Sequence, residues 1–288
     1  MGHDTRIGFI GLGDQGGPMA QRTAEAGFPT TVWARRPATL EPFAGVPFSV
    51  AGSPAEVGAA SEVACICVVD DAGVLEVADG LLAGMAAGGV IVVHSTVHPD
   101  TCHEVARRAA ARRVAVVDAP VSGGGAMALE RRLLVMAGGA AEDVDRCRPV
   151  FAAYGDPVLH LGPLGAGQAA KLLNNLLFTA HLALATDLFA LGRALGVDPA
   201  SLTEVLAHGS GRSYGVQVTA GMGHSAVPLG AHAGPLLRKD VGIVADIAGR
   251  LGVKSDALFA AADAMLAGFG LPRTATEPEA PALGNEDA

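Results

Sequence analysis

The stretch RIGFIGLGDQG, residues 6–16, decides how this chain folds. Residues 6–10 form a short apolar run, and a helical pattern begins at Gly16 and closes at Gly27. Between the two, glycines in the spacing G-x-G-x-x-G allow the backbone to approach a pyrophosphate held at the helix N-terminus. A glycine-rich turn would carry the same letters, but the strand before it and the helix after it favour a dinucleotide site. Its residues are Gly11, Leu12, Gly13, Asp14, Gln15 and Gly16.

Short apolar runs alternate with helical stretches beyond this unit. The runs are residues 30–34, 63–69, 90–94 and 114–118, and the helical stretches include 73–87 and 99–112. Such alternation is typical of a doubly wound parallel sheet, because parallel strands need crossover connections. Residues 133–137 and 158–161 add two strands around a helix at 142–154. We therefore predict an α/β fold whose N-terminal Rossmann domain, the dinucleotide-binding domain, spans residues 1–162.

The β pattern stops at Gly165, and KLLNNLLFTAHLALATDLFALGRALG, residues 171–196, follows without a proline. From near Gly167, a run of nearly thirty residues predicts ~45 Å of helix that is apolar almost all round. Its polar side chains interrupt it too often for a membrane span, so burial against its own domain or a second subunit explains it better. We predict an all-α substrate and dimerisation domain at 163–271, joined through this long interdomain helix, in a homodimer or higher homo-oligomer. The tail 272–288, rich in Pro, Glu and Ala, is predicted to be disordered.

The composition excludes several classes of protein. Half of the 288 residues are hydrophobic and 17% are charged, which fits a globular chain of about two domains. The net charge of −9 argues against nucleic acid or an anionic membrane as a partner, since phosphates need a basic surface. The histidines and the four cysteines show no metal-ligand spacing, so we expect no metal site. With no secretion signal recognised in MGHDTRIGFIGLG, we expect a reducing cytoplasm.

The residues after the second apolar run indicate the choice of cofactor. An acidic residue roughly twenty positions after the glycine turn would bind the ribose 2′-hydroxyl of NAD. Here residues 31–37 read TVWARRP, and the first carboxylate is Glu41. Arg35 and Arg36 stand where a 2′-phosphate would lie, so the sequence favours NADP without excluding NAD. Two arginines of a solvated loop would give the same pattern.

Two polar segments follow apolar runs, at the sheet edge where ligands bind in this fold. Thr96 lies two residues beyond one run, and DAPVSGG, residues 118–124, follows the next. Ser122 with the N–H groups of Gly123 and Gly124 offers several donors to a carboxylate. A plain turn would also use glycines.

Lys171 lies one turn into the long apolar helix, with Asn174 and Asn175 on or beside the same face at i+3 and i+4. Flanked by Leu172 and Leu173, its amine would be partly desolvated, as suits a group that transfers protons. A lysine that extends to water from the helix start explains the residue equally well.

Four blocks resemble the β-hydroxyacid dehydrogenase family, the group of 3-hydroxyisobutyrate dehydrogenase, tartronate semialdehyde reductase and 6-phosphogluconate dehydrogenase. They are GFIGLGDQGGPM at 8–19, DAPVSGG at 118–124, GAGQAAKLLNN at 165–175 and Lys239-Asp240, with Ser95-Thr96 and Pro99 as a weaker fifth. The resemblance implies that Lys171 is the general acid/base and that Asn175 orients the substrate. It implies a carboxylate site at Ser122, Gly123 and Gly124, and it places Thr96 and Lys239 along the cleft for nicotinamide and substrate.

The implied activity is transfer of a hydride between NADP(H) and the β-carbon of a small β-hydroxyacid or semialdehyde. The chain departs from the family pattern at 130–132, where a glycine is common, and at 230–234, where an aromatic is often found. These departures leave the substrate undecided. Imine reductases share the architecture but usually lack the catalytic lysine, so Lys171 favours hydroxyacid chemistry. A non-catalytic NADP-binding module would need neither that lysine nor the carboxylate site.

Overall fold

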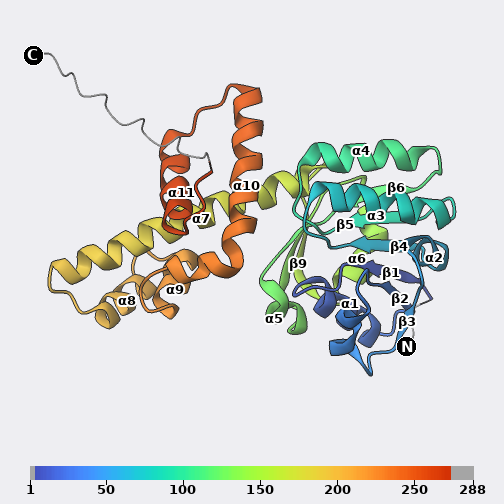
Figure 1. Ribbon diagram of the computed structural model, residues 1–288, viewed down its shortest axis with the longest axis horizontal. Coiled ribbons are helices and arrows are strands. Elements are labelled where there is room, and N and C mark those ends of the chain that lie inside the picture. Colours follow the sequence, from blue (N-terminus) through green and yellow to red (C-terminus); the bar gives the residue numbers. More distant parts are fainter. Residues whose placement is uncertain (1–3, 274–288) are drawn as a thin grey trace, which may run out of the picture. The chain divides into compact units, whose positions relative to one another are not determined.

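The computed structural model describes residues 4–273 and divides the chain into two compact units, the first ending at Lys171 and the second beginning at Leu172 (Figure 1). Within the described residues, all strands belong to the first unit and the second is helical. Each unit has hydrophobic cores of its own. Apart from Pro272 and Arg273, the tail predicted to be disordered lies outside the described residues.

A six-stranded parallel sheet dominates the first unit, in the order β3-β2-β1-β4-β5-β6. Its strands are β1 (Ile7–Ile10), β2 (Thr30–Trp33), β3 (Phe48–Val50), β4 (Val63–Ile66), β5 (Val90–Val93) and β6 (Ala115–Asp118). β1, β4 and β5 are buried along their whole length, as expected of strands covered on both faces. The strand order reverses between β1 and β4, the switch point where such sheets hold ligands. The predicted doubly wound α/β fold is confirmed.

Helices enclose a separate hydrophobic core on each face of this sheet. The core around Phe9 gathers residues of α1 and α6, and the core around Ile10 gathers residues of α2, α3 and α4. Successive residues of a strand point to opposite faces, which is why these two neighbours belong to different cores. The bounds are α1 (Gly16–Glu25), η1 (Pro37–Phe43), α2 (Pro54–Ala60), α3 (Asp71–Gly84), α4 (Pro99–Ala110) and α6 (Ala141–Phe151).

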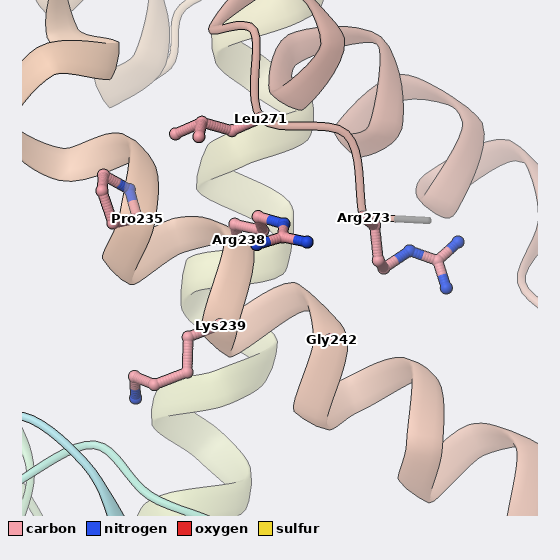
Figure 2. Close-up of a pocket in the computed structure, with 6 residues that line it drawn as sticks. All are labelled: Pro235, Arg238, Lys239, Gly242, Leu271 and Arg273. Carbon is pink, nitrogen blue, oxygen red and sulfur yellow. The ribbon is translucent and has the colours of Figure 1, made fainter. Parts of the chain in front are cut away.

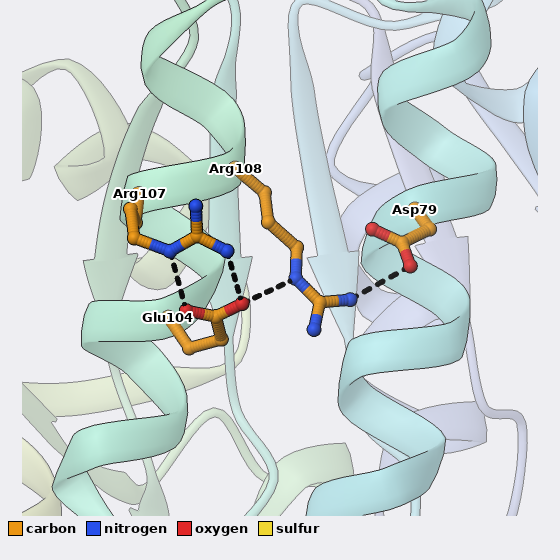
Figure 3. A network of polar contacts seen from close by, with 4 residues as sticks. All are labelled: Asp79, Glu104, Arg107 and Arg108. Carbon is orange, nitrogen blue, oxygen red and sulfur yellow. Dashed lines mark hydrogen bonds and ion pairs between the residues drawn. The ribbon is translucent and has the colours of Figure 1, made fainter.

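A chain of ion pairs links α3 and α4 on the surface (Figure 3). The guanidinium of Arg108 donates to Glu104 at 2.8 Å and to Asp79 of α3 at 2.7 Å. Arg107 donates two further hydrogen bonds, each of 2.7 Å, to the same Glu104. Hydrogen bonds from Arg107 and then from Arg108 lower the pKa of Glu104 to about 2. This carboxylate therefore stays charged in all but strongly acidic solution.

A second sheet of three strands, in the order β7-β8-β9, completes the first unit. β7 (Val121–Ser122) is antiparallel to β8 (Leu133–Ala137), which is parallel to β9 (Gly155–His160). The two additional strands predicted from the sequence thus exist, in a sheet of their own. The short helix α5 (Gly124–Leu129) connects β7 to β8.

The 29-residue helix α7 (Ala166–Ala194) begins in the first unit and contributes to the core of the second. Leu172 and Leu176 of α7 share one core with Val241 of α10 and Leu266 of α11. By length and composition α7 would pass for a membrane span, as core helices of soluble proteins also do, and 44% of its apolar window is buried in protein. The other helices are α8 (Pro199–His208), α9 (Tyr214–Gly221), η2 (Val227–Leu229), α10 (Gly230–Leu251) and α11 (Asp256–Gly268).

Candidate active site

The three glycines of the turn between β1 and α1 have three different surroundings. At Gly11 the backbone has φ +98°, and a Cβ would lie 2.1 Å from the carbonyl oxygen of Cys67. At Gly16 a Cβ would lie 1.9 Å from the carbonyl oxygen of Gly11, so helix and strand could not approach so closely. At Gly13 a Cβ would meet no atom within 4 Å. The protein leaves the space over Gly13 open, as a dinucleotide pyrophosphate requires.

The remaining turn residues differ in burial. Leu12 is 4% exposed and packs in the core around Phe9, Gln15 is half-buried, and Asp14 is exposed. The backbone of Asp14 lies against α5, because a Cβ on Gly125 would meet its carbonyl oxygen at 2.2 Å. The dinucleotide turn and the start of α5 are therefore neighbours within the first unit.

Ser122, Gly123 and Gly124 form the corner between β7 and α5. Ser122 is half-buried, and the two exposed glycines have φ values of +135° and +74°, which residues with side chains rarely adopt. A Cβ on Gly124 would meet no atom within 4 Å. The corner thus presents one hydroxyl and bare backbone, which a small carboxylate can approach closely.

Arg35 and Arg36 follow β2 and are exposed. The guanidinium of Arg35 lies 2.8 Å from a carboxylate oxygen of Glu76 on α3, and both side chains are 67% exposed. This ion pair was not expected from the sequence, because Glu76 is distant along the chain and the first carboxylate after the arginines is Glu41. A cofactor 2′-phosphate would compete with Glu76 for Arg35, and the exposed ion pair is weak enough to be displaced.

Two buried polar side chains hold the beginning of α7. Asp118, at the end of β6, accepts the backbone N–H of Gly165 on Oδ1 and that of Gln168 on Oδ2, both at 2.7 Å. The side chain of Gln168 accepts the N–H of Val97 at 3.0 Å and donates to the carbonyl oxygen of Ser95 at 2.8 Å. Burial raises the pKa of Asp118, while hydrogen bonds from these N–H groups oppose the rise. Both residues lie within the sequence motifs at 118–124 and 165–175, but no role was predicted for either.

Thr96 and Lys171 both adjoin this arrangement. Thr96, half-buried, lies between the two residues that the side chain of Gln168 binds. Lys171, also half-buried, follows Gln168 by three residues and is the last residue of the first unit. Asn175 is one turn further along α7.

In the second unit, Asp240 connects two of the predicted substrate-binding residues. The amide nitrogen of Asn175 donates to Oδ2 of Asp240 at 2.6 Å, and Nζ of Lys239 lies 2.8 Å from Oδ1. Asp240 is 2% exposed, so its charge is balanced by Lys239 rather than by water. The Lys-Asp pair was recognisable in the sequence, but its contact with Asn175 was not, because Asn175 and Asp240 lie 65 positions apart.

A cavity of about 230 Å³ lies beside Lys239 in the second unit (Figure 2). Its charged lining is basic, and Figure 2 shows Lys239 pointing away from the two arginines. Arg273 donates to both carboxylate oxygens of Asp263, at 2.9 and 2.7 Å, and Arg238 donates to the carbonyl oxygen of Pro272. The arginines are therefore partly used by the protein itself. The lining residues are Pro235, Arg238, Lys239, Gly242, Leu271 and Arg273.

The described residues contain no group of three His, Cys, Asp or Glu side chains suited to a metal ion. His94 is buried in the first unit, and His98 accepts the N–H of Asp100 at the start of α4. The candidate residues thus form two sets. The first unit places the glycine turn beside the start of α5 and Thr96 beside the start of α7, whereas the second joins Asn175 and Lys239 through Asp240.

Comparison with known proteins identifies the family. Models of the NAD binding domain of 6-phosphogluconate dehydrogenase and of the NAD-binding region of NADP-dependent 3-hydroxyisobutyrate dehydrogenase match residues 6–162 and 165–270. The chain is 37% identical to L-threonate dehydrogenase of Cupriavidus necator over 212 residues, 72% of this chain and 71% of that protein. It is 36% identical to 3-hydroxyisobutyrate dehydrogenase of Pseudomonas aeruginosa over 217 residues, 74% of this chain and 73% of that protein.

The match to a solved structure supports the same family. Mycobacterium tuberculosis 3-hydroxyisobutyrate dehydrogenase with L-serine has a TM-score of 0.83 at 27% identity, and the match covers 92% of this chain and 94% of that one. The family models and the relatives together span both units of the chain. The chain therefore belongs to the β-hydroxyacid dehydrogenase family of NAD(P)-dependent oxidoreductases.

Proposed function

We propose that the enzyme moves a hydride between NADP(H) and the β-carbon of a small β-hydroxyacid or semialdehyde, with Lys171 as general acid/base. The observation that carries the proposal is the position of Lys171. It follows Gln168, which is bonded on both sides of Thr96, and it precedes Asn175 by one helical turn. The helix segment that carries Lys171 is therefore attached at the carboxyl edge of the sheet, where ligands bind in this fold.

The geometry of the glycine turn fits a bound dinucleotide. Its backbone would hold the pyrophosphate over Gly13, where a Cβ would find open space. Arg35 and Arg36 would bind the 2′-phosphate, which is why we propose NADP rather than NAD, and Thr96 and Lys239 would line the nicotinamide. Bound there, the nicotinamide ring supplies the hydride donor or acceptor at its C4.

Lys171 handles the proton of the reaction. In oxidation its neutral amine accepts the proton of the β-hydroxyl as the hydride leaves the same carbon, and the product is a carbonyl. In reduction its ammonium group returns that proton to the carbonyl oxygen. Ser122, Gly123 and Gly124 bind the substrate carboxylate, and Asn175, its amide held by Asp240, orients the substrate.

We also propose that the enzyme is a cytoplasmic homodimer or higher homo-oligomer, built on residues 165–270. α7 exposes a row of leucines at helical spacing, on a helix whose other side is buried. Monomeric proteins rarely leave such a contiguous apolar surface in water. The four cysteines are free, which is consistent with a reducing compartment. The leucines are Leu173, Leu177, Leu184, Leu188 and Leu191.

The central test compares Lys171→Ala with Lys254→Ala, a control at an exposed lysine outside the helices. Oxidation of 3-hydroxyisobutyrate, L-serine and L-threonate is measured with NADP and NAD, and reduction of the matching semialdehydes and of cyclic imines is measured with NADPH and NADH. Cofactor affinity is measured by calorimetry on the same preparations. We expect Lys171→Ala to lower kcat by about 10²–10⁴-fold, the usual contribution of a positioned acid or base, with cofactor affinity unchanged. Lys254→Ala should match the unmodified enzyme. Near full turnover in Lys171→Ala, or activity confined to cyclic imines, would refute the proposal.

A further inference from the structure

The start of α7 is capped from a distant strand. The first N–H groups of a helix have no partners within it, and a Ser, Thr, Asp or Asn side chain just before the helix usually supplies one. Here Gly165 precedes the helix and has no side chain. Asp118 supplies the cap from β6, one carboxylate oxygen to each of two N–H groups at 2.7 Å. The helix start is thereby bound to the end of the strand that leads into the Ser122 corner.

Two glycines make room for this carboxylate. A Cβ on Gly138 would lie 2.5 Å from Oδ1 of Asp118, and a Cβ on Gly167 would lie 2.8 Å from Oδ2. Gly138 also exchanges backbone hydrogen bonds with Asp118, of 3.0 and 2.7 Å. Glycine at these two positions therefore leaves room for the carboxylate to pack against the helix start.

Gln168 adds a second attachment, to a different loop. Its side chain is fully buried and bonds the carbonyl oxygen of Ser95 and the N–H of Val97, the residues on either side of Thr96. One residue thus connects β6, α7 and the loop after β5. We call Asp118, Gln168 and the backbone groups that they bind the helix-start clamp.

We propose that Asp118 and Gln168 are positioning residues for the dehydrogenase reaction, which fix Lys171 relative to Thr96 through the helix-start clamp. This inference rests on the proposed role of Lys171. Lys171 lies three positions after Gln168 along the helix, a rise of about 4.5 Å, so a tilt or rotation of the helix start moves the amine directly. Neither residue touches the reactants in this account. Both act through the backbone that carries Lys171.

The test uses variants that keep shape and remove hydrogen bonds. Gln168→Met removes both side-chain bonds, and Asp118→Asn replaces one acceptor oxygen with a donor that faces an N–H group. Ser53→Ala, which removes the side-chain cap of α2 in the same unit, controls for loss of a cap as such. We expect Gln168→Met and Asp118→Asn to lower kcat by roughly 10–10²-fold, because misplacement by about 1 Å has effects of that size. Cofactor affinity should be unchanged, the pH profile of kcat should shift, and Ser53→Ala should retain full turnover.

A double-mutant cycle with Lys171→Ala separates the clamp from the proposed function. If the clamp acts through Lys171, Gln168→Met lowers kcat in the unmodified enzyme but has little further effect in Lys171→Ala. Equal effects in both backgrounds, or a loss of thermal stability with unchanged kcat, would overturn the clamp while leaving the role of Lys171 intact. Full turnover in the single variant Lys171→Ala would overturn both the clamp and the proposed role of Lys171. If Gln168→Met does not fold, the same cycle is run with Asp118→Asn.

Discussion

His94 should make the first unit sensitive to mild acid. Its ring is 3% exposed, stacks on Phe9 with centroids 6.0 Å apart, and lies with Nδ1 2.6 Å from the carbonyl oxygen of Ala119. A carbonyl can only accept, so Nδ1 carries the proton and Nε2 accepts the hydroxyl of Tyr154 at 3.0 Å. Protonation of Nε2 would bring a buried charge and reverse the bond with Tyr154, whose hydroxyl proton would lose this acceptor. Burial lowers the pKa of His94 from 6.5 to about 4, and the bond to Ala119 opposes this only in part.

The size of the effect follows from this shift. The unfolded chain takes up the proton near pH 6.5, whereas the folded chain resists it until about pH 4. The contribution of His94 to stability is therefore complete above pH 6.5 and is lost as the pH falls toward 4. A shift of this size is equivalent to about 3 kcal/mol of unfolding free energy at pH 4, since one pKa unit is about 1.4 kcal/mol.

The assay is urea unfolding followed by the fluorescence of Trp33, the single tryptophan, which lies in the first unit. Unfolding free energies of the unmodified protein, His94→Gln and the exposed control His208→Gln are compared between pH 7 and pH 4. Carboxylates titrate alike in all three proteins, so their contribution cancels in the comparison. We expect His94→Gln to lose less stability than the other two as the pH falls, whatever its stability at pH 7. The same pH dependence in all three proteins would refute the reasoning.

Four further predictions test the surface network, the cofactor and the assembly. Glu104 should titrate near pH 2 by NMR, with its stabilising contribution lost as the pH falls from 4.5 toward 2, and titration near 4.5 would show that its arginine partners do not hold it. Arg35→Asp should weaken the binding of NADP but not of NAD, by about 1.5–3 kcal/mol for each charge-assisted bond lost, as measured by calorimetry. Glu76→Gln should strengthen the binding of NADP, because Arg35 would lose its ion pair with Glu76. Equal affinities for NADP and NAD in the unmodified protein would contradict the proposed preference for NADP. Leu184→Glu with Leu191→Glu should shift the sedimenting species to monomer, and a monomer before mutation would exclude the oligomer.

The local pattern was sufficient for much of the fold. Buried parallel strands appear as uninterrupted apolar runs, so β4 and β5 were predicted close to their observed positions. The second sheet begins with β7, a strand of two residues that is too short to show a period. Sequence spacing does not reveal which strands pair when the pairing residues are this few.

The candidate site was predictable to the extent that it is local. Helical spacing placed Lys171 and Asn175 one turn apart, and α7 carries both. The contacts of Asp118 were hidden because its partners lie 47 and 50 residues further along the chain. The pairing of Arg35 with Glu76 was hidden for the same reason. The roles of the site residues in catalysis stay predictions.

Different constraints maintain the three glycines of the first turn. Alanine at position 11 or 16 would collide with the backbone, so folding alone maintains those two glycines. Alanine at position 13 would meet no protein atom, and such a replacement even stabilises many proteins by about 0.4–1 kcal/mol through the unfolded chain. Only the bound dinucleotide opposes it. In a homologue that no longer binds the cofactor, Gly13 could be substituted, whereas Gly11 and Gly16 would be retained. A substitution at position 13 alone would therefore indicate that cofactor binding had been lost.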